Sequence, residues 1–342
     1  MMWHSKILKY LFIPFFSCTL FANEVNIYTS RHYDADNDLY KKFTDTTGIA
    51  VNIISGSGSS LVERLKLEGS NSPGDIFFTV DAGNLSNIEK EGLFQGITSL
   101  YTLSRVPENL RGPSNRWVAI AKRARVLFYN PESIEKDKIL NLSYEDLANE
   151  EWKGKIAIRS STNMYNQSLV ASLIANIGVE ATEKWGRNLV KNFVRTPQGN
   201  DRAQILAVAN GEAEIAIANS YYFGIMLSGQ SGEAQKKAAE KVAIHFPNQL
   251  NRGTHVNISG AGILKHSPNK QNAEKFLEFL LSEEAQIHIV NNTFEYPILP
   301  NVMPSPYIAQ FGTDFKVDEI SVSSFGEYNP EAVRLMDRVG WK

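Results

Sequence analysis

Short runs of β-branched and aromatic residues alternate with segments of helical hydrophobic spacing along most of this chain. Such alternation is typical of α/β proteins, in which helices cover a sheet that contains parallel strands. In the first part of the chain, the pattern predicts a helix after each of the first two strands, around Leu39 and Phe43 and around Leu61 and Leu65. The first helix should end near Gly48, because glycine readily adopts the left-handed conformation of a helix C-cap. The strands predicted here are 25–28, 51–54 and 76–80.

The same alternation resumes after residue 129 and indicates a second lobe with its own sheet. A later strand pattern at 256–264 is followed by helical spacing at 272–281 and 283–290. If the chain returns there to the first lobe, two connections cross between the lobes and form a hinge. The elements predicted in the second lobe are strands at 155–158 and 215–218 and helices at 167–176, 180–191 and 203–209.

The length of the chain supports this division into two lobes. A mature chain of roughly 320 residues exceeds the usual size of one hydrophobic core. We expect a first lobe formed by residues 23–124 and 252–290, and a second lobe formed by residues 125–251 and 291–342.

Residues 1–22 have the pattern of a secretory signal peptide. Lys6 and Lys9 give a basic start, a short apolar segment follows, and residues 21–22 form an imperfect cleavage site. The only cysteine, Cys18, lies inside this segment, so the mature chain contains no thiol and no disulfide. A lipoprotein signal that uses Cys18 is the alternative, but the bulky residues before it are a poor approach to such a cleavage site.

The charge balance excludes two classes of partner. The formal net charge of −2 becomes about −4 once the two signal lysines are removed, and no basic run remains. This composition argues against a general nucleic-acid binder and a membrane-surface binder. No later apolar stretch is long enough to cross a bilayer. We therefore expect a soluble protein that is exported to the periplasm and is not inserted in the membrane.

Three aspartates at alternate positions, Asp34, Asp36 and Asp38, resemble the start of a calcium-binding loop. However, Leu39 stands where the turn glycine is required, and Asp45 replaces the bidentate glutamate. We therefore favour a different role, in which these acids cap the first helix and stabilise its dipole.

A glycine- and serine-rich segment at residues 56–60 lies between a predicted strand and a predicted helix. Its free N–H groups and hydroxyls suit an oxyanion, with Ser57 and Ser59 as candidate contacts. The segment lacks the lysine and the spacing of a P-loop, and a tight structural turn needs no ligand. Both interpretations stay open.

No recognisable catalytic constellation is present. The mature chain contains no cysteine and no Gly-x-Ser-x-Gly nucleophile elbow. Its histidines show no His-x-x-x-His or comparable metal-binding spacing. Ser160, Ser161 and Asp201 come nearest to a hydrolase site, but no recognised spacing supports them. We therefore expect that the protein is not an enzyme.

Several tyrosines lie just beyond predicted strands, where α/β sheets place their ligand-binding loops. A single tyrosine more commonly packs in a core or at its rim, so the joint placement is what suggests a metal site. Phenolates favour hard, highly charged cations such as Fe(III), because only an acidic cation displaces the phenol proton at neutral pH. The candidate ligands are His32, Tyr33, Tyr165, Tyr221 and Tyr222.

Five short blocks stand out by their order and separation: Thr29-Ser30-Arg31-His32-Tyr33-Asp34, Ser72-Pro73-Gly74-Asp75-Ile76, Lys122-Arg123-Ala124-Arg125, Asn163-Met164-Tyr165-Asn166-Gln167-Ser168 and Asn219-Ser220-Tyr221-Tyr222. In these blocks the chain resembles the bacterial periplasmic ferric-iron-binding proteins of ABC importers, especially the subgroup with a His-Tyr pair. The resemblance extends through most of the mature chain.

This resemblance implies a two-lobe, type II periplasmic binding protein with a hinge and a ligand cleft between the lobes. It places first-lobe ligands at His32 and Tyr33 and second-lobe ligands at Tyr165, Tyr221 and Tyr222. It also implies an inner-membrane ABC permease and its ATPase as partners, and no catalytic turnover. We expect a monomer, as is usual for a docking carrier.

Four phenolates would outweigh the three positive charges of Fe(III). Arg31 and Arg202 are therefore candidates to stabilise the ligand oxygens or to hold a small anion such as carbonate. Some relatives have an arginine shortly after the tyrosine pair, whereas this chain has residues 223–226, Phe-Gly-Ile-Met. Because this arginine is absent, the resemblance does not imply that carbonate is an obligatory ligand. The alternative function is a binding protein for a small oxyanion, a polyamine or another organic solute.

Overall fold

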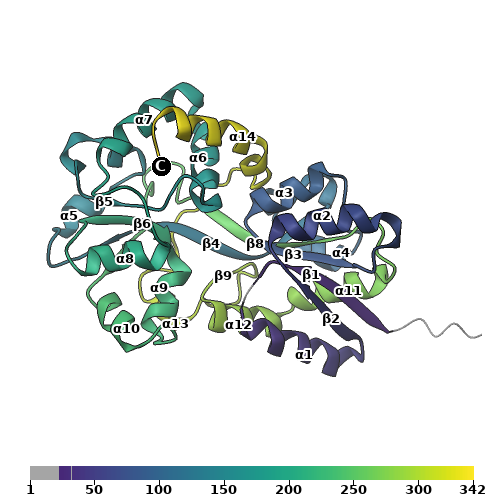
Figure 1. Cartoon of the computed structure of the whole chain (residues 1–342). Coiled ribbons are helices and arrows are strands. Elements are labelled where there is room, and N and C mark those ends of the chain that lie inside the picture. The colour runs from purple at the N-terminus through teal and green to yellow at the C-terminus, as the bar shows by residue number, and fades with distance from the viewer. Residues whose placement is uncertain (1–22, 32) are drawn as a thin grey trace, which may run out of the picture.

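The computed structural model describes residues 23–31 and 33–342, which form two α/β lobes side by side (Figure 1). The predicted signal peptide and His32 lie outside the described residues. Each lobe has its own sheet, and strand β4 (Trp117–Tyr129) contributes to both sheets. The expected two-lobe α/β architecture is confirmed.

The first-lobe sheet combines the start of β4 with β1 (Glu24–Thr29), β2 (Ala50–Ser55), β3 (Ile76–Val80) and β8 (Val256–Ile263). The strand order is β2-β1-β3-β8-β4. β1 is parallel to β2 and β3, whereas β8 is antiparallel to β3 and β4. β1 and β3 are buried almost throughout, as expected for parallel strands that are covered on both faces.

Six helices accompany this sheet on the right of Figure 1. They are α1 (Ala35–Thr47), α2 (Gly58–Glu68), α3 (Ala82–Lys90), α4 (Leu100–Arg105), α11 (Lys270–Leu280) and α12 (Glu283–Thr293). The aromatic ring of Phe43 on α1 packs against Phe276 and Phe279 on α11, which joins distant parts of the chain in one core.

The second-lobe sheet combines the end of β4 with β5 (Ile156–Ala157), β6 (Ile215–Asn219) and β7 (Ala243–His245). A two-residue strand, β9 (Tyr296–Pro297), pairs with the first-lobe part of β4. The helices of this lobe are α5 (Lys136–Ile139), α6 (Met164–Ile177), α7 (Val179–Lys191), α8 (Asp201–Ala209), α9 (Ser220–Leu227), α10 (Glu233–Ala239), α13 (Pro306–Ala309) and α14 (Ser323–Arg338).

The predicted strands and helices are all present, with ends that differ by a few residues. Gly48 ends α1 in the left-handed conformation, with φ of 69°, and its N–H donates to the carbonyl of Thr44. Several further elements were not predicted, and β4 and α14 are the longest of them. The long strand β4 carries Lys122, Arg123 and Arg125 in its middle, which hides its strand character, and α14 contains an internal proline, Pro330.

The prediction that the first aspartates cap α1 was wrong for Asp34. This residue precedes the helix, but its side chain accepts no capping hydrogen bond. Asp36 and Asp38 do lie in the first turn, where the helix dipole favours acids. In the neighbouring segment, Ser57 caps α2 by accepting from the N–H of Ser60 at 3.2 Å, so this loop has a structural role.

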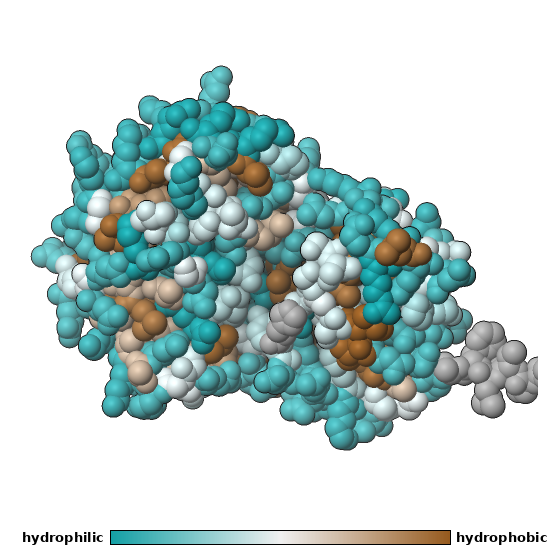
Figure 2. Space-filling view, in the orientation of Figure 1, coloured by the Kyte–Doolittle hydropathy of each residue, from teal (hydrophilic) through white to brown (hydrophobic). Residues whose placement is uncertain are grey.

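None of the described helices is both long and apolar enough to cross a membrane. The face seen in the space-filling view is mostly hydrophilic and is hollowed where the two lobes meet (Figure 2).

Helix α14 packs on α6 of its own lobe and also on α3 of the first lobe. Its contact with α3 is close, because a Cβ at Gly326 would overlap the side chain of Ser86. Beside this contact, the ammonium of Lys90 donates to the carbonyl of Gly326 at 2.7 Å. A residue without a side chain is therefore required at the junction of α3 and α14.

We predict that Gly326→Ala lowers the free energy of unfolding by about 1–3 kcal/mol, since the added methyl group forces α3 and α14 apart. The control is Gly58→Ala at the start of α2, where a Cβ meets no atom within 4 Å. That variant should keep or slightly raise stability, because alanine is the better helix former. Urea denaturation followed by circular dichroism measures both, and equal midpoints for the two variants would contradict the prediction.

Candidate metal centre

The tyrosines singled out in the sequence come from three segments at the junction of the lobes. Tyr33 follows β1, and Tyr165 lies in the first turn of α6, where Asn163 caps the helix by accepting from the N–H of Tyr165. Tyr221 and Tyr222 lie in the first turn of α9, directly after β6. The loops that follow β1 and β6 thus bring first-lobe and second-lobe phenols toward each other.

The four tyrosine side chains form one cluster around Tyr221. The hydroxyl oxygens of Tyr165 and Tyr221 are 3.4 Å apart, and the rings of Tyr33 and Tyr221 meet edge to face with centroids 6.5 Å apart. The ring of Tyr222 lies against that of Tyr221, with centroids 4.2 Å apart. His32 lies outside the described residues, so its place relative to this cluster is not described.

Arg123 joins the two lobes at this cluster. Its guanidinium donates to the hydroxyl of Tyr33 at 2.8 Å and stands 4.7 Å from the ring centroid of Tyr221. A second guanidinium, that of Arg159, lies 5.5 Å from the ring centroid of Tyr165. Sequence reasoning did not assign either arginine to the site. The only available signal was the alternation along β4, which directs Arg123 and Arg125 to the same face of the strand.

Arg123 belongs to a buried network of ion pairs beneath Tyr33. Its Nε donates to Glu295 at 2.6 Å, and Glu295 also faces Arg31 at 3.5 Å. Arg31 binds Asp36 at 2.9 Å and stacks on Tyr33 at 4.7 Å from the ring centroid. Arg31 is therefore beside the tyrosine cluster, and its charge is already matched by carboxylates.

A second network supports the helices that carry the other tyrosines. Arg125 donates to Asp201 at 3.0 Å and to Asn166 at 2.5 Å, which ties β4 to α8 and α6. Arg159 also approaches Asp201, at 3.6 Å. Two arginines thus share a single carboxylate beneath Tyr165, so this network has one surplus positive charge.

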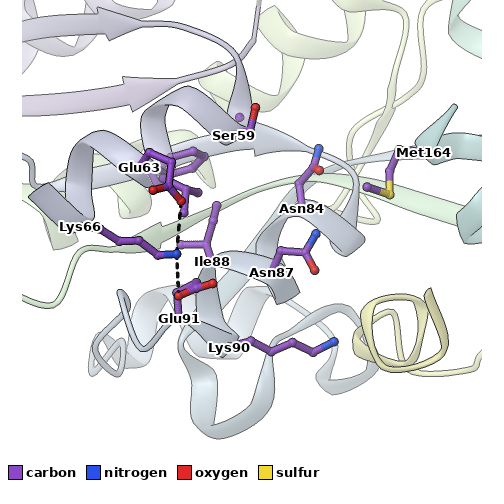
Figure 3. Close-up of a pocket in the computed structure, with 12 residues that line it drawn as sticks. Ser59, Glu63, Lys66, Asn84, Asn87, Ile88, Lys90, Glu91 and Met164 are labelled. Carbon is purple, nitrogen blue, oxygen red and sulfur yellow. Dashed lines mark hydrogen bonds and ion pairs between the residues drawn. The ribbon is translucent and has the colours of Figure 1, made fainter. Parts of the chain in front are cut away.

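Three further candidates are placed differently. Among the described residues, no hydrogen bond or ion pair joins Arg202, Ser57 or Ser59 to the tyrosine cluster. Ser57 caps α2, and Ser59 lines a groove of about 560 Å³ between α2 and α3 (Figure 3). A separate cavity of about 250 Å³ lies beside Tyr33 and is lined in part by Arg31.

Burial suppresses ionisation of the phenols. It raises the pKa of Tyr33 well above its usual value, and Glu295 adds to this effect while Arg123 and Arg31 oppose it. Burial, followed by the nearby phenols Tyr165 and Tyr33, also raises the pKa of Tyr221. For Tyr222, burial and the neighbouring Tyr165 and Asp201 raise the pKa to about 12. These three hydroxyls are therefore protonated at neutral pH unless a cation displaces the proton.

The tyrosine cluster differs from common metal sites in the type of its donor groups. Within residues 23–31 and 33–342, no group of three or more His, Cys, Asp and Glu side chains is arranged to hold a metal ion. This finding also gives no support to a calcium loop at Asp34, Asp36 and Asp38. Phenol oxygens, with a guanidinium beside them, are thus the available donors, and they suit a hard cation.

Two lobes joined through shared strands, with polar groups that converge between them, define a protein that binds a solute in a cleft. The chain belongs to the family of bacterial extracellular solute-binding proteins, which it matches over residues 28–287.

The relatives extend this assignment. The chain is 48% identical to iron uptake protein A1 of Synechocystis over 319 residues, which cover 93% of this chain and 88% of the relative. A structure of a Trichodesmium protein in complex with iron and citrate ligands is 49% identical and covers 93% of this chain and 100% of that one, with a TM-score of 0.89. A ferric binding protein from Campylobacter jejuni is 43% identical, with the same coverage and a TM-score of 0.86.

We predict that Glu295→Gln destabilises the metal-free protein by about 3–5 kcal/mol at neutral pH, because two buried guanidinium groups lose their shared charge partner. Burial alone would raise the pKa of Glu295, but Arg123 and Arg31 hold it below its usual value. The ionised carboxylate therefore contributes stability above about pH 4.3, and this contribution is lost as the pH falls through the lower native pKa.

The difference between wild type and Glu295→Gln should accordingly shrink below about pH 4 in urea titrations. Glu183→Gln is the control, since Glu183 pairs with Arg187 and Arg338 at the surface and should change little. A difference between wild type and Glu295→Gln that stays constant with pH would show that charge is not the cause.

Proposed function

We propose that this protein captures Fe(III) in the cleft between its lobes and delivers it to an ABC permease of the inner membrane. The observation that carries the proposal is the meeting of tyrosine side chains from both lobes beside Arg123, which donates to the hydroxyl of Tyr33, while the hydroxyls of Tyr165 and Tyr221 lie 3.4 Å apart. The proposed ligands are Tyr33, Tyr165, Tyr221 and Tyr222 with His32. The iron and ferric-iron names of the relatives support the same cargo.

Electrostatics supports a trivalent cation. Four phenolates around Fe(III) carry one net negative charge. The ion pairs beneath Tyr33 are balanced, because Arg31 and Arg123 face Asp36 and Glu295. The surplus cation shared between Arg125 and Arg159 lies beneath Tyr165 and offsets part of the remaining negative charge. A divalent ion with the same ligands would leave an additional negative charge in a largely buried site, which is unfavourable.

The distribution of ligands suggests an order of events. The second lobe supplies three phenols, so iron binds there first, and hinge closure then adds Tyr33 and His32 to the coordination sphere. The proposed lobes are residues 23–124 with 252–290 and residues 125–251 with 291–342. Closure reports the loaded state to the permease, whose ATPase drives release on the other side of the membrane.

The remaining proposals concern the oligomeric state of the protein, its location and an additional anion at the metal centre. The protein acts as a monomer in the periplasm after removal of residues 1–22, and it catalyses no reaction. A small anion such as carbonate is proposed as an additional ligand, since the cavity beside Tyr33 leaves room for one. Arg31 is the cationic residue that lines this cavity, and Asp34 and Asp36 line it as well. Arg202, Ser57 and Ser59 have no contact that favours such a role.

We predict that titration with ferric citrate produces a visible tyrosinate-to-iron charge-transfer band. Tyr165→Phe and Tyr221→Phe should weaken or abolish the band, whereas Tyr129→Phe, which removes a hydroxyl at the far end of β4, should keep it. Calorimetry of the metal-stripped protein with phosphate, sulfate and spermidine tests the alternative. A colourless protein that one of these solutes saturates would favour a carrier of oxyanions or polyamines.

We also predict that iron binding releases protons. Because the pKa values of Tyr33, Tyr221 and Tyr222 lie above the usual value, these groups are protonated before iron arrives. Each phenolate that forms releases roughly one proton, so affinity should fall steeply from neutral pH toward about pH 4. Potentiometry at constant pH should find about one proton fewer per iron in Tyr221→Phe. Affinity that stays flat over this range would exclude phenolate ligation.

A further inference from the structure

Asp81 has an unusual backbone conformation at the end of β3. Its φ is 74° and its ψ is 125°, a combination that strongly favours glycine. The residue is almost completely buried. A strained, buried aspartate persists only where the surrounding contacts hold it in place, and such residues cluster at sites that act in binding or switching.

The contacts of Asp81 reach across the lobes. Its Oδ1 accepts from the N–H of Gly83 at 2.9 Å and from the hydroxyl of Ser168 at 2.8 Å. Gly83 belongs to α3 of the first lobe, whereas Ser168 belongs to α6 of the second. The other oxygen, Oδ2, is buried without a hydrogen-bond partner among the described residues. Burial raises the pKa of this carboxyl group, and the hydrogen bond from Ser168 opposes that effect more than the nearby Asn257 and Arg123 do.

The backbones of α3 and α6 approach closely at this point. A Cβ on Gly83 would lie 3.1 Å from Met164 Sδ and 3.7 Å from Ser168 Oγ, so glycine makes room for the first turns of α6. Met164 extends from the second lobe to the end of the groove between α2 and α3, where it lies beyond Asn84 (Figure 3). The contact between Asp81 and Ser168 is therefore part of a fitted seam between the lobes.

Helix α6 belongs both to the seam between the lobes and to the metal centre. Tyr165 and Ser168 are three residues apart on α6, a spacing that places them on neighbouring positions of the helix surface. A motion that carries Tyr165 toward Tyr33 therefore carries Ser168 toward Asp81. A hydrogen bond to a buried carboxylate is stronger than one between neutral groups, so its formation favours the closed arrangement.

We propose that the hydrogen bond from Ser168 to Asp81 is a latch that holds the two lobes closed around the metal centre. Ser168 and Asp81 are positioning residues, since neither contacts the tyrosine oxygens. The proposal of a latch rests on the proposed function, because its main test measures the release of bound iron.

The test compares two serines on the same helix. Ser168→Ala removes the latch hydroxyl, whereas Ser172→Ala removes an equally buried hydroxyl one turn later, which donates to Asp318 and does not reach α3. Stopped-flow loss of the charge-transfer band in excess EDTA gives the rate of iron release. We expect Ser168→Ala to release iron on the order of tenfold faster than wild type, with Ser172→Ala within about twofold.

A conservative variant distinguishes loss of the hydrogen bond between Ser168 and Asp81 from a general change in packing. Asp81→Asn keeps an oxygen acceptor for Ser168 and tolerates positive φ, so it should release iron more slowly than Ser168→Ala. The position of the charge-transfer band should be the same in all loaded variants, because the tyrosine oxygens are retained. Equal release rates for Ser168→Ala and Ser172→Ala, or a shifted band in Ser168→Ala alone, would overturn the latch.

Failure of the proposed function gives a different result. If wild type develops no charge-transfer band, iron capture is overturned, and small-angle scattering of the same proteins decides the latch. A larger radius of gyration for Ser168→Ala than for Ser172→Ala would then support it, and identical values would overturn it.

Discussion

The structure depends on one buried cation at the junction of the lobes, the guanidinium of Arg123. An isolated charge in such a place costs several kcal/mol, so its neighbours must balance it. Glu295 supplies the balancing negative charge, and the hydroxyl of Tyr33 accepts a hydrogen bond from the same guanidinium. These three residues lie far apart in sequence and come from β4, the segment after α12 and the segment after β1. Balancing one charge thus aligns both lobes and fixes the first-lobe phenol.

Strand β4 repeats the arrangement two residues further on. Because side chains of a strand point to the same face at every second position, Arg125 lies on the same side as Arg123. Arg125 binds Asp201 and Asn166, so it ties down the helices α8 and α6 beneath Tyr165. One continuous strand therefore anchors Tyr33, the proposed first-lobe ligand, with one arginine and the helix of Tyr165, a proposed second-lobe ligand, with another. This arrangement explains why a charged segment can run through the core of the molecule.

Local patterns sufficed to predict most elements and the tyrosine cluster. Strands and helices follow from periodicity, and residues that follow strand ends lie where each sheet binds ligands, which made Tyr33, Tyr165 and Tyr221 candidates for one site although they belong to two sheets. The ion pairs were not predictable in this way. Glu295 lies 172 residues from Arg123, and no periodic signal joins two such positions.

The remaining differences also have a long-range cause. Asp36, in the first turn of α1, is engaged by Arg31 in the buried network, so its role is not limited to the helix dipole. Lys122, Arg123 and Arg125 give β4 a charged middle, although the partners of Arg123 and Arg125 come from distant parts of the chain. The positive φ of Asp81 is equally invisible in sequence, because aspartate carries no signal of that conformation as glycine does.

The protonated phenols account for the choice of tyrosine over carboxylate in such a site. Carboxylates are ionised at neutral pH, so four of them in a buried cleft would repel one another before any metal arrived. Phenols whose pKa is raised by burial stay neutral in the metal-free state, and the ion pairs beneath Tyr33 stay balanced without cargo. Negative charge then develops only as a strongly acidic cation displaces the protons. We therefore propose that the site discriminates by the acidity of the cation as well as by its charge, and that its electrostatic cost arises only in the loaded state.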